Sequence, residues 1–293
     1  MVEDIVNEIV FHTGINKETI LLMGNMVLNN RFYKRAAIAK KDGSKRIIYL
    51  PDSELKLVQH FIVSYYFSSY KFDRNIVTAY IKGSSVKNNA LQHRFNEHFL
   101  FIDIHDFFNS IDFDLLLEIM IKIFKNYDKK SLEFLLDICS YKRKFVQGCV
   151  SSPFLSNIYM ADFDNNILQA IKDFDTTIYT RYSDDITFSS KNLIDNSISL
   201  IVENGLKSLK LRINYKKTHF SSNLQNVKVT GLRIKGNGFV SLDTKFKKKL
   251  KNEIYICLHF PETSKDLIEQ VIGKLSYLKS IDPYYYNKLN IKY

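Results

Sequence analysis

Two adjacent aspartates between apolar segments constrain the fold of this chain most. Asp184 and Asp185 lie between Thr177–Tyr182 and Ile186–Ser189, a pattern typical of a β-hairpin with a polar tip. Neighbouring carboxylates in a tight turn repel each other unless a cation neutralises them. A third aspartate, Asp103, ends another apolar segment that begins at His98. The pattern therefore predicts rigid strands that bring three carboxylates together.

Such a set of carboxylates is suited to holding divalent metal ions. Transfer of a nucleotide to a 3′ end uses two ions about 4 Å apart, and Mg²⁺ prefers carboxylate and phosphate oxygens. Asp103, Asp184 and Asp185 are therefore the candidate ligands. The pair of aspartates in the turn has a simpler alternative, because aspartate is common in turns without any ligand.

The rest of the chain predicts a mixture of helices and hairpins. Hairpins are expected around a basic turn at 33–50 and around a glycine-containing turn at 227–242. Apolar periodicity predicts helices at 1–30, 53–70, 113–138, after Pro153, at 193–209 and after 243. No regular alternation of strand and helix occurs, so we expect an α+β fold, an antiparallel sheet with helices on one face.

Charge and cysteine content narrow the class of protein. Lys and Arg number 42 against 31 Asp and Glu, a formal net charge of +11, which favours a polyanionic partner. A basic protein without such a partner is the alternative. Three cysteines without a CxxC pair argue against a disulfide framework or a zinc site. With no apolar run long enough to cross a bilayer, we expect a cytoplasmic protein that does not bind membranes.

Three ordered stretches carry a resemblance to a known family. Residues 101–111 read FIDIHDFFNSI, residues 147–153 read QGCVSSP, and residues 182–185 read YSDD. Together they resemble the motifs of the reverse transcriptases, within them the retron type. The resemblance implies a right-hand polymerase, with fingers and palm at 1–242 and a helical thumb at 243–293.

The resemblance also implies roles for individual residues. Asp103, Asp184 and Asp185 would hold two Mg²⁺ ions. Phe108 falls at the position that excludes a ribose 2′-OH and so favours dNTPs, and Gln147 and Gly148 would contact the nucleotide. Lys217 would lie beside the leaving pyrophosphate. Lys40 and Arg46 would hold the triphosphate. For the lysines and Arg46, a solvated surface charge is the alternative.

Shorter elements favour the retron branch. Asn89 to His93 resembles its NAxxH element, and residues 229–231 resemble its VTG triplet. Retron enzymes commonly have Ala where this chain has Ser183, and many carry a His-Gly-Phe-like sequence where it has residues 78–80. The RNA-binding residues expected from the resemblance and from the basic tail are Asn89, His93, Lys247, Lys248, Lys249 and Lys251. Asn89 and His93 could instead be satisfied within the fold.

A retron enzyme is expected to use a cognate structured non-coding RNA as template and primer. Its product would be branched RNA–DNA (msDNA), made from dNTPs, and it would act with an effector protein in antiphage defence. Two alternatives remain open at this stage. One is another stand-alone bacterial reverse transcriptase, of the abortive-infection or diversity-generating type. The other is a non-catalytic RNA-binding scaffold.

Overall fold

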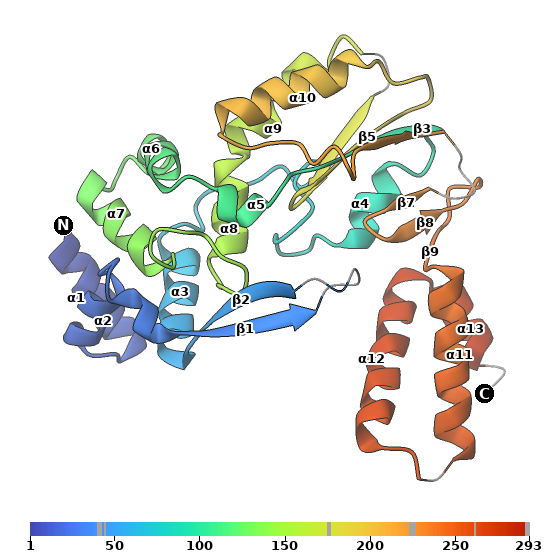
Figure 1. Ribbon diagram of the computed structural model, residues 1–293, viewed down its shortest axis with the longest axis horizontal. Coiled ribbons are helices and arrows are strands. Elements are labelled where there is room, and N and C mark those ends of the chain that lie inside the picture. Colours follow the sequence, from blue (N-terminus) through green and yellow to red (C-terminus); the bar gives the residue numbers. More distant parts are fainter. Residues whose placement is uncertain (40–42, 44, 175–176, 223–226, 261, 291–293) are drawn as a thin grey trace.

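A computed structural model describes the chain except residues 40–42, 44, 175–176, 223–226, 261 and 291–293 (Figure 1). The N-terminal part begins with helices α1 (Val2–Thr13) and α2 (Lys17–Met23) and the 3-10 turn η1 (Asn29–Phe32). Strands β1 (Tyr33–Ala39) and β2 (Lys45–Pro51) then form the expected antiparallel hairpin.

Helix α3 (Ser53–Tyr65) follows this hairpin and is shorter than expected. Asp52 caps it, because the Asp52 side chain accepts a hydrogen bond from the Leu55 amide at 2.9 Å. Helix α4 (Val86–Gln92) comes after a segment without regular structure. The prediction of a helix at 53–70 was therefore right in kind but wrong at its end.

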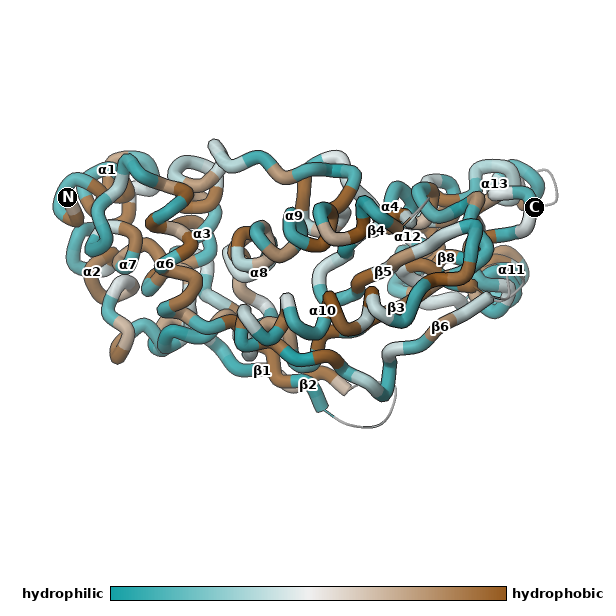
Figure 2. The backbone as a smooth tube through the Cα atoms, turned by 90° about the horizontal axis from the view of Figure 1, so that it is seen from above, coloured by the Kyte–Doolittle hydropathy of each residue, from teal (hydrophilic) through white to brown (hydrophobic). Residues whose placement is uncertain are grey.

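Four antiparallel strands form the central sheet, in the order β4-β5-β3-β6. They are β3 (His98–Asp103), β4 (Ile178–Tyr182), β5 (Asp185–Ser190) and β6 (His219–Ser221). The predicted hairpin with the aspartates at its tip is thus confirmed as β4–β5. Figure 2 shows hydrophobic residues running through the neighbouring strands β3 and β5.

One face of this sheet is packed against helices. Leu100, Ile102, Ile186 and Phe188 point to the same side and belong to the larger hydrophobic core. Buried residues of several helices share that core. These helices are α6 (Phe113–Ile123), α7 (Lys129–Ile138), α8 (Ser152–Tyr159), α9 (Ala161–Ala170) and α10 (Ser197–Ser208). The short helix α5 (Phe107–Ser110) follows β3. At the end of the sheet near Asp103, the opposite face borders a pocket.

Two of the expected helices differ in their bounds. The helix predicted for 113–138 is two helices, because Phe124 leaves helical geometry and Asp128 caps α7 through the Ser131 amide. The helix predicted for 193–209 begins only at Ser197, since the Asp195 side chain accepts from the Ser197 amide at 2.7 Å and forms a turn there. The segment after Pro153 is helical with an interruption at Met160.

The C-terminal part holds a small sheet and a helical lobe. The predicted hairpin at 227–242 is a three-stranded sheet of β7 (Lys228–Val229), β8 (Leu232–Ile234) and β9 (Val240–Ser241). Helices α11 (Thr244–His259), α12 (Lys265–Ile281) and α13 (Pro283–Asn290) form the lobe (Figure 1). A second hydrophobic cluster joins this lobe to the small sheet, to α4 and to Phe99 of β3. Among the described helices, none combines the length and apolar character of a bilayer span.

Candidate active site

The three aspartates lie together at one end of the central sheet. Asp103 is the last residue of β3 and pairs in register with Asp185, the first residue of β5. Asp184 lies in the preceding turn, and its carbonyl oxygen accepts a hydrogen bond from the Ile104 amide at 3.1 Å. The antiparallel register therefore gathers carboxylates that are more than 80 residues apart in sequence.

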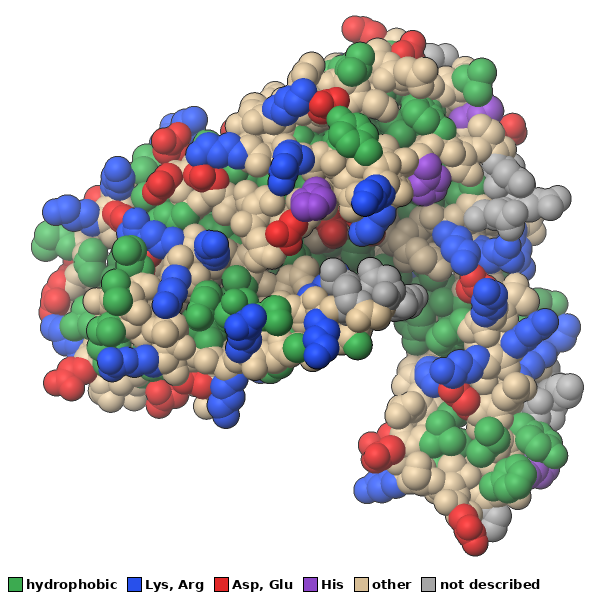
Figure 3. Space-filling view, viewed as in Figure 1, with side chains coloured by type: hydrophobic (Ala, Val, Ile, Leu, Met, Phe, Trp, Pro, Cys, Tyr) green, Lys and Arg blue, Asp and Glu red, His purple; other side chains and the backbone are tan. Residues whose placement is uncertain are grey.

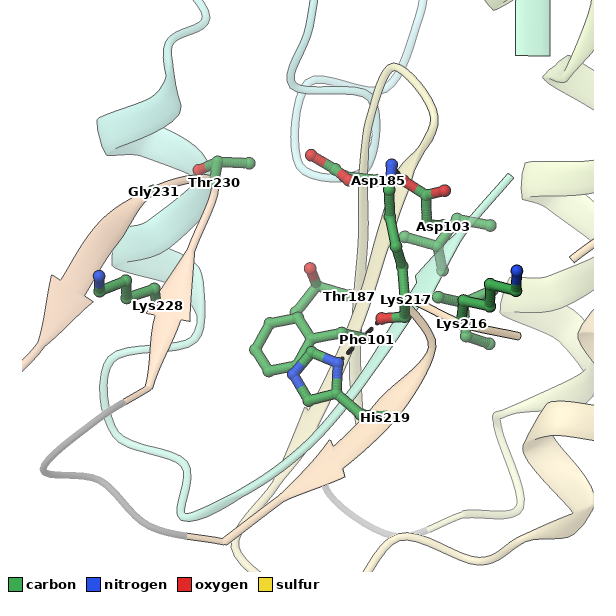
Figure 4. Close-up of a pocket in the computed structure, with 12 residues that line it drawn as sticks. Phe101, Asp103, Asp185, Thr187, Lys216, Lys217, His219, Lys228, Thr230 and Gly231 are labelled. Atoms are coloured by element: carbon green, nitrogen blue, oxygen red, sulfur yellow. Dashed lines mark hydrogen bonds and ion pairs between the residues drawn. The ribbon is translucent and has the colours of Figure 1, made fainter. Parts of the chain in front are cut away.

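Two polar side chains from the segment before β6 contact Asp103. Asn214 Nδ2 donates to Asp103 Oδ1 at 2.7 Å, and Lys217 Nζ donates to Asp103 Oδ2 at 2.8 Å. Figure 4 shows Lys217 reaching toward Asp103, with Asp185 beside them at the wall of a pocket. The Lys217 ammonium therefore places a positive charge next to Asp103.

The surroundings of the carboxylates disfavour their charge. Burial, with the neighbouring Asp184 and Asp103, raises the pKa of Asp185 to about 6. Burial raises the pKa of Asp184 as well, and the charge of Asp103 contributes. The hydrogen bond to Asp103 raises the pKa of Lys217, which therefore stays protonated. Three carboxylates face one lysine, so a bound divalent cation would relieve their repulsion.

The donor set fits a hard divalent ion that is shared with substrate. Asp103 and Asp185 line one pocket of about 520 Å³, and Asp103 and Asp184 line a neighbouring pocket of about 490 Å³. Within the described ranges, no group of three acidic, His or Cys side chains is already arranged as a metal cage. Mg²⁺ in nucleotide-transfer sites is held by one or two carboxylates together with phosphates, which suits this arrangement.

A buried arginine supports the turn that carries Asp184. Arg181 on β4 is fully buried, and its guanidinium donates to both carboxylate oxygens of Asp164 on α9. It also donates to the Ser183 carbonyl at 3.1 Å and to Asn157 Oδ1 at 3.1 Å. Sequence reasoning missed this network. An arginine inside an otherwise apolar strand was the available signal, since a buried charge needs a partner.

Most residues expected to bind the nucleotide line one pocket next to Asp184. Its volume is about 300 Å³, and Arg46, Phe108, Gln147 and Gly148 line it together with Asp184. These residues come from β2, α5 and the loop before α8. Lys40 lies outside the described residues. Tyr80, which had no expected role in binding the nucleotide, also lines this pocket.

Gly148 is required where two backbone segments meet. Its φ is +103°, and a Cβ there would come within 2.4 Å of the Tyr49 carbonyl oxygen on β2. The Tyr49 amide donates to the Gln147 carbonyl at 2.9 Å. Glycine is thus needed for close contact with the β1–β2 hairpin, whereas the expectation was close contact with a nucleotide.

Direct RNA contact by Asn89 and His93 was the wrong prediction, because both side chains are fully buried. His93 Nδ1 contacts Ser189 Oγ and Nε2 contacts Thr180 Oγ1, each at 2.7 Å. Burial lowers the pKa of His93 to about 3, so the ring is neutral. Thr180 of β4 and Ser189 of β5 are buried and need hydrogen-bond partners. His93, at the end of α4, supplies one to each.

The four lysines of α11 that were expected to bind RNA differ in what they contact. Lys247 Nζ lies 2.5 Å from Asp282 Oδ2 and 2.6 Å from Ser241 Oγ, above the ring of Tyr285. Lys247 is therefore committed to holding α13 and does not fit the expected contact with RNA. Lys248 and Lys249 are exposed and Lys251 is half-buried. Figure 3 shows Lys and Arg side chains on both sides of the hollow between the helical lobe and the β1–β2 hairpin.

Comparison with known proteins identifies the family. The model of the reverse transcriptases, described as RNA-dependent DNA polymerases, matches residues 38–234, more than half of the chain. The chain belongs to the reverse transcriptase family. It is 31% identical over 282 residues to the retron Ec73 reverse transcriptase of Escherichia coli, covering 89% of this chain and 86% of that protein. With the E. coli retron Ec86 reverse transcriptase it shares 30% identity over 287 residues, 92% and 82% of the two chains.

Solved structures show the same fold at low sequence identity. A telomerase structure from Candida albicans matches 86% of this chain with a TM-score of 0.53 and 13% identity. The Sicinivirus 3Dpol RNA-dependent RNA polymerase matches 79% with a TM-score of 0.50 and 11% identity. The chain spans 56% and 58% of those two chains. The right-hand polymerase fold is therefore confirmed.

Membership of this family and the retron relatives establish the reaction class. This retron-type reverse transcriptase is an RNA-directed DNA polymerase, and polymerases of the family use divalent metal ions. An RNA template is accordingly its partner.

Proposed function

We propose that this reverse transcriptase copies a cognate structured non-coding RNA into DNA, with two Mg²⁺ ions held by Asp103, Asp184 and Asp185. The register that pairs Asp103 with Asp185, with Asp184 facing the neighbouring pocket, is the observation that carries the proposal. When bound, such ions activate the attacking oxygen and stabilise the leaving pyrophosphate.

The residues around Asp184 support a site for the incoming dNTP. Arg46 at the rim of the pocket can make two hydrogen bonds to a phosphate. Lys217, protonated and hydrogen-bonded to Asp103, can neutralise negative charge that develops on the leaving group. We retain Lys40 as a second triphosphate contact. Gln147 lines both pockets that Asp184 borders, where it can hydrogen-bond to a sugar or base.

Phe108 is proposed to select the sugar. Its side chain is 9% exposed and lines the nucleotide pocket, so a ribose 2′-OH there would meet an apolar ring. Replacing Phe108 with Ala should increase rNTP incorporation relative to dNTP incorporation. Equal discrimination in the variant and the wild type would contradict this assignment of the pocket.

The remaining parts of the proposal concern the RNA. Residues 1–242 would form fingers and palm, and residues 243–293 the thumb. Lys248, Lys249 and Lys251 on α11 lie where they can follow an RNA backbone. The two retron relatives support a single RNA that serves as template and primer and gives a branched RNA–DNA product, msDNA. By the same likeness we infer a role in antiphage defence beside an effector protein, in the cytoplasm.

Isolation of the bound nucleic acid tests the proposal. The chain is expressed with its flanking genomic DNA, beside Asp184→Asn and the matched control Asp162→Asn, an exposed aspartate on α9. We expect a short single-stranded DNA joined 2′–5′ to RNA from the wild type and the control. The Asp184→Asn variant should yield RNA without DNA.

Two other outcomes would redirect the assignment. Bound RNA without DNA, with incorporation on an added primer–template, would retain the polymerase and point to another stand-alone bacterial type. DNA synthesis at the wild-type level by Asp184→Asn would refute the metal assignment.

A further inference from the structure

Two departures from the family's common pattern meet in space. Tyr80 stands where many relatives have the Phe of a His-Gly-Phe-like sequence, and Ser183 stands where retron enzymes commonly have Ala. Each departure adds one hydroxyl group. The Tyr80 hydroxyl donates a hydrogen bond to Ser183 Oγ at 3.1 Å, across 103 residues of sequence.

Both residues are held in an unusual backbone geometry. The φ angle is +61° at Tyr80 and +62° at Ser183, a left-handed region that non-glycine residues adopt only when the surroundings impose it. The Thr78 amide donates to the Arg181 carbonyl at 3.0 Å, and Asn157 Nδ2 donates to the Ala79 carbonyl at 2.9 Å. The segment before Tyr80 is therefore anchored to the strand that leads into the catalytic turn.

The Tyr80 side chain connects the wall of the nucleotide pocket to the turn. The residue is 46% exposed and lines the pocket with Phe108 and Asp184. The ring centroids of Tyr80 and Phe108 lie 6.4 Å apart. Ser183 is buried, and its side chain lies close enough to the Asp184 carboxyl to oppose the rise in that group's pKa. The Tyr80 hydroxyl thus links the pocket wall to the residue next to Asp184.

We propose that Tyr80 and Ser183 form a coupled positioning pair, which fixes the orientation of Asp184 and the sugar-facing wall for the incoming nucleotide. The inference rests on the nucleotide pocket assigned above. Tyr80 lines the pocket beside Phe108, and Ser183 adjoins Asp184, so their hydrogen bond links the aromatic wall of the pocket to the turn that carries Asp184. Loss of either hydroxyl should therefore weaken nucleotide binding in the same way.

A double-mutant cycle with Tyr80→Phe and Ser183→Ala tests the coupling. The assay is single-nucleotide incorporation on a fixed RNA template with an annealed DNA primer, from which KM for the dNTP and kcat are obtained. One neutral hydrogen bond corresponds to about a three- to tenfold effect. Each single variant should raise KM by that factor, and the double variant should be no worse than either, because one interaction is removed in all three.

Two controls separate positioning from general stability. Tyr65→Phe removes a hydroxyl of similar exposure (49%) on α3 and should leave KM unchanged. The thermal midpoints of all variants should stay within about 2 °C of the wild type, since one partly exposed hydrogen bond is lost.

The outcomes are distinct. Additive increases in KM, or an unchanged KM in Tyr80→Phe, would overturn the coupled pair while leaving the polymerase intact. Unchanged sugar discrimination in Phe108→Ala would instead remove the pocket assignment on which the pair depends. A fall in the thermal midpoint that accounts for the loss of activity would reduce Tyr80 to a structural role and overturn the proposal.

Discussion

Replacement of Arg181 by Met should separate the stability of this reverse transcriptase from its activity. The guanidinium donates to Asp164 Oδ1 at 2.9 Å and Oδ2 at 2.7 Å, to Asn157 and to the Ser183 carbonyl. Both charged side chains are at most 5% exposed. Met fills a similar volume but leaves the Asp164 carboxylate buried without a cation.

The expected loss of stability follows from leaving the Asp164 charge unpaired. Removing one partner of a buried ion pair costs about 3–5 kcal/mol, a large fraction of the 5–15 kcal/mol that stabilises a typical domain. Adding Asp164→Asn to Arg181→Met removes the second charge and should recover more than half of the loss. The Tyr179 hydroxyl, which donates to Asp164 Oδ1 at 2.6 Å, keeps an acceptor in the Asn side chain.

Activity should not recover with stability. In the double variant the Ser183 carbonyl still lacks the hydrogen bond from Arg181, so the turn that carries Asp184 loses a contact that fixes its position. The assays are urea unfolding followed by circular dichroism and dNTP incorporation at a temperature where both variants are folded. A loss below about 1 kcal/mol in Arg181→Met, or full activity in the double variant, would refute this reasoning.

Further predictions concern other parts of the site and the C-terminal helical lobe. Gly148→Ala should lower the free energy of unfolding by more than about 1 kcal/mol and reduce dNTP incorporation, because the added Cβ would overlap the Tyr49 carbonyl. An unchanged midpoint of urea unfolding would contradict the close contact. Asp185→Asn should raise the thermal midpoint of metal-free protein at pH 8, and the gain should fade as the pH falls from 6 to 4, because the wild-type carboxyl with its pKa of about 6 becomes protonated there. A gain that is the same at both ends of this range would contradict the raised pKa. Lys247→Ala should destabilise the C-terminal helical lobe by about 3 kcal/mol, because it leaves the buried carboxylate of Asp282 unpaired. Lys248→Ala should change stability by less than about 0.5 kcal/mol and weaken RNA binding with a smaller salt dependence. A larger loss of stability in Lys248→Ala than in Lys247→Ala would contradict the structural role of Lys247 and the RNA-binding role of Lys248.

The local sequence pattern was sufficient to predict several of the strands. The β4–β5 hairpin and strand β3 were predicted because alternating and apolar residues next to turn residues favour strands within a few positions. The resemblance of the ordered motifs to those of the reverse transcriptases also predicted the polymerase fold. The breaks at Phe124 and before Ser197 were missed because the apolar spacing continues across them, while aspartate side chains supply new hydrogen bonds.

Pairings between distant residues were decided only by the tertiary structure. By sequence alone, His93 could bind RNA or be satisfied inside the protein, and its burial between Thr180 and Ser189 settles the question. Tyr80 was noted as a departure in one motif and Ser183 in another, and only the fold brings their hydroxyls together. The physical reason is that a side chain's chemistry is set by sequence, whereas its partner, burial and charge state depend on which strands and helices pack against it.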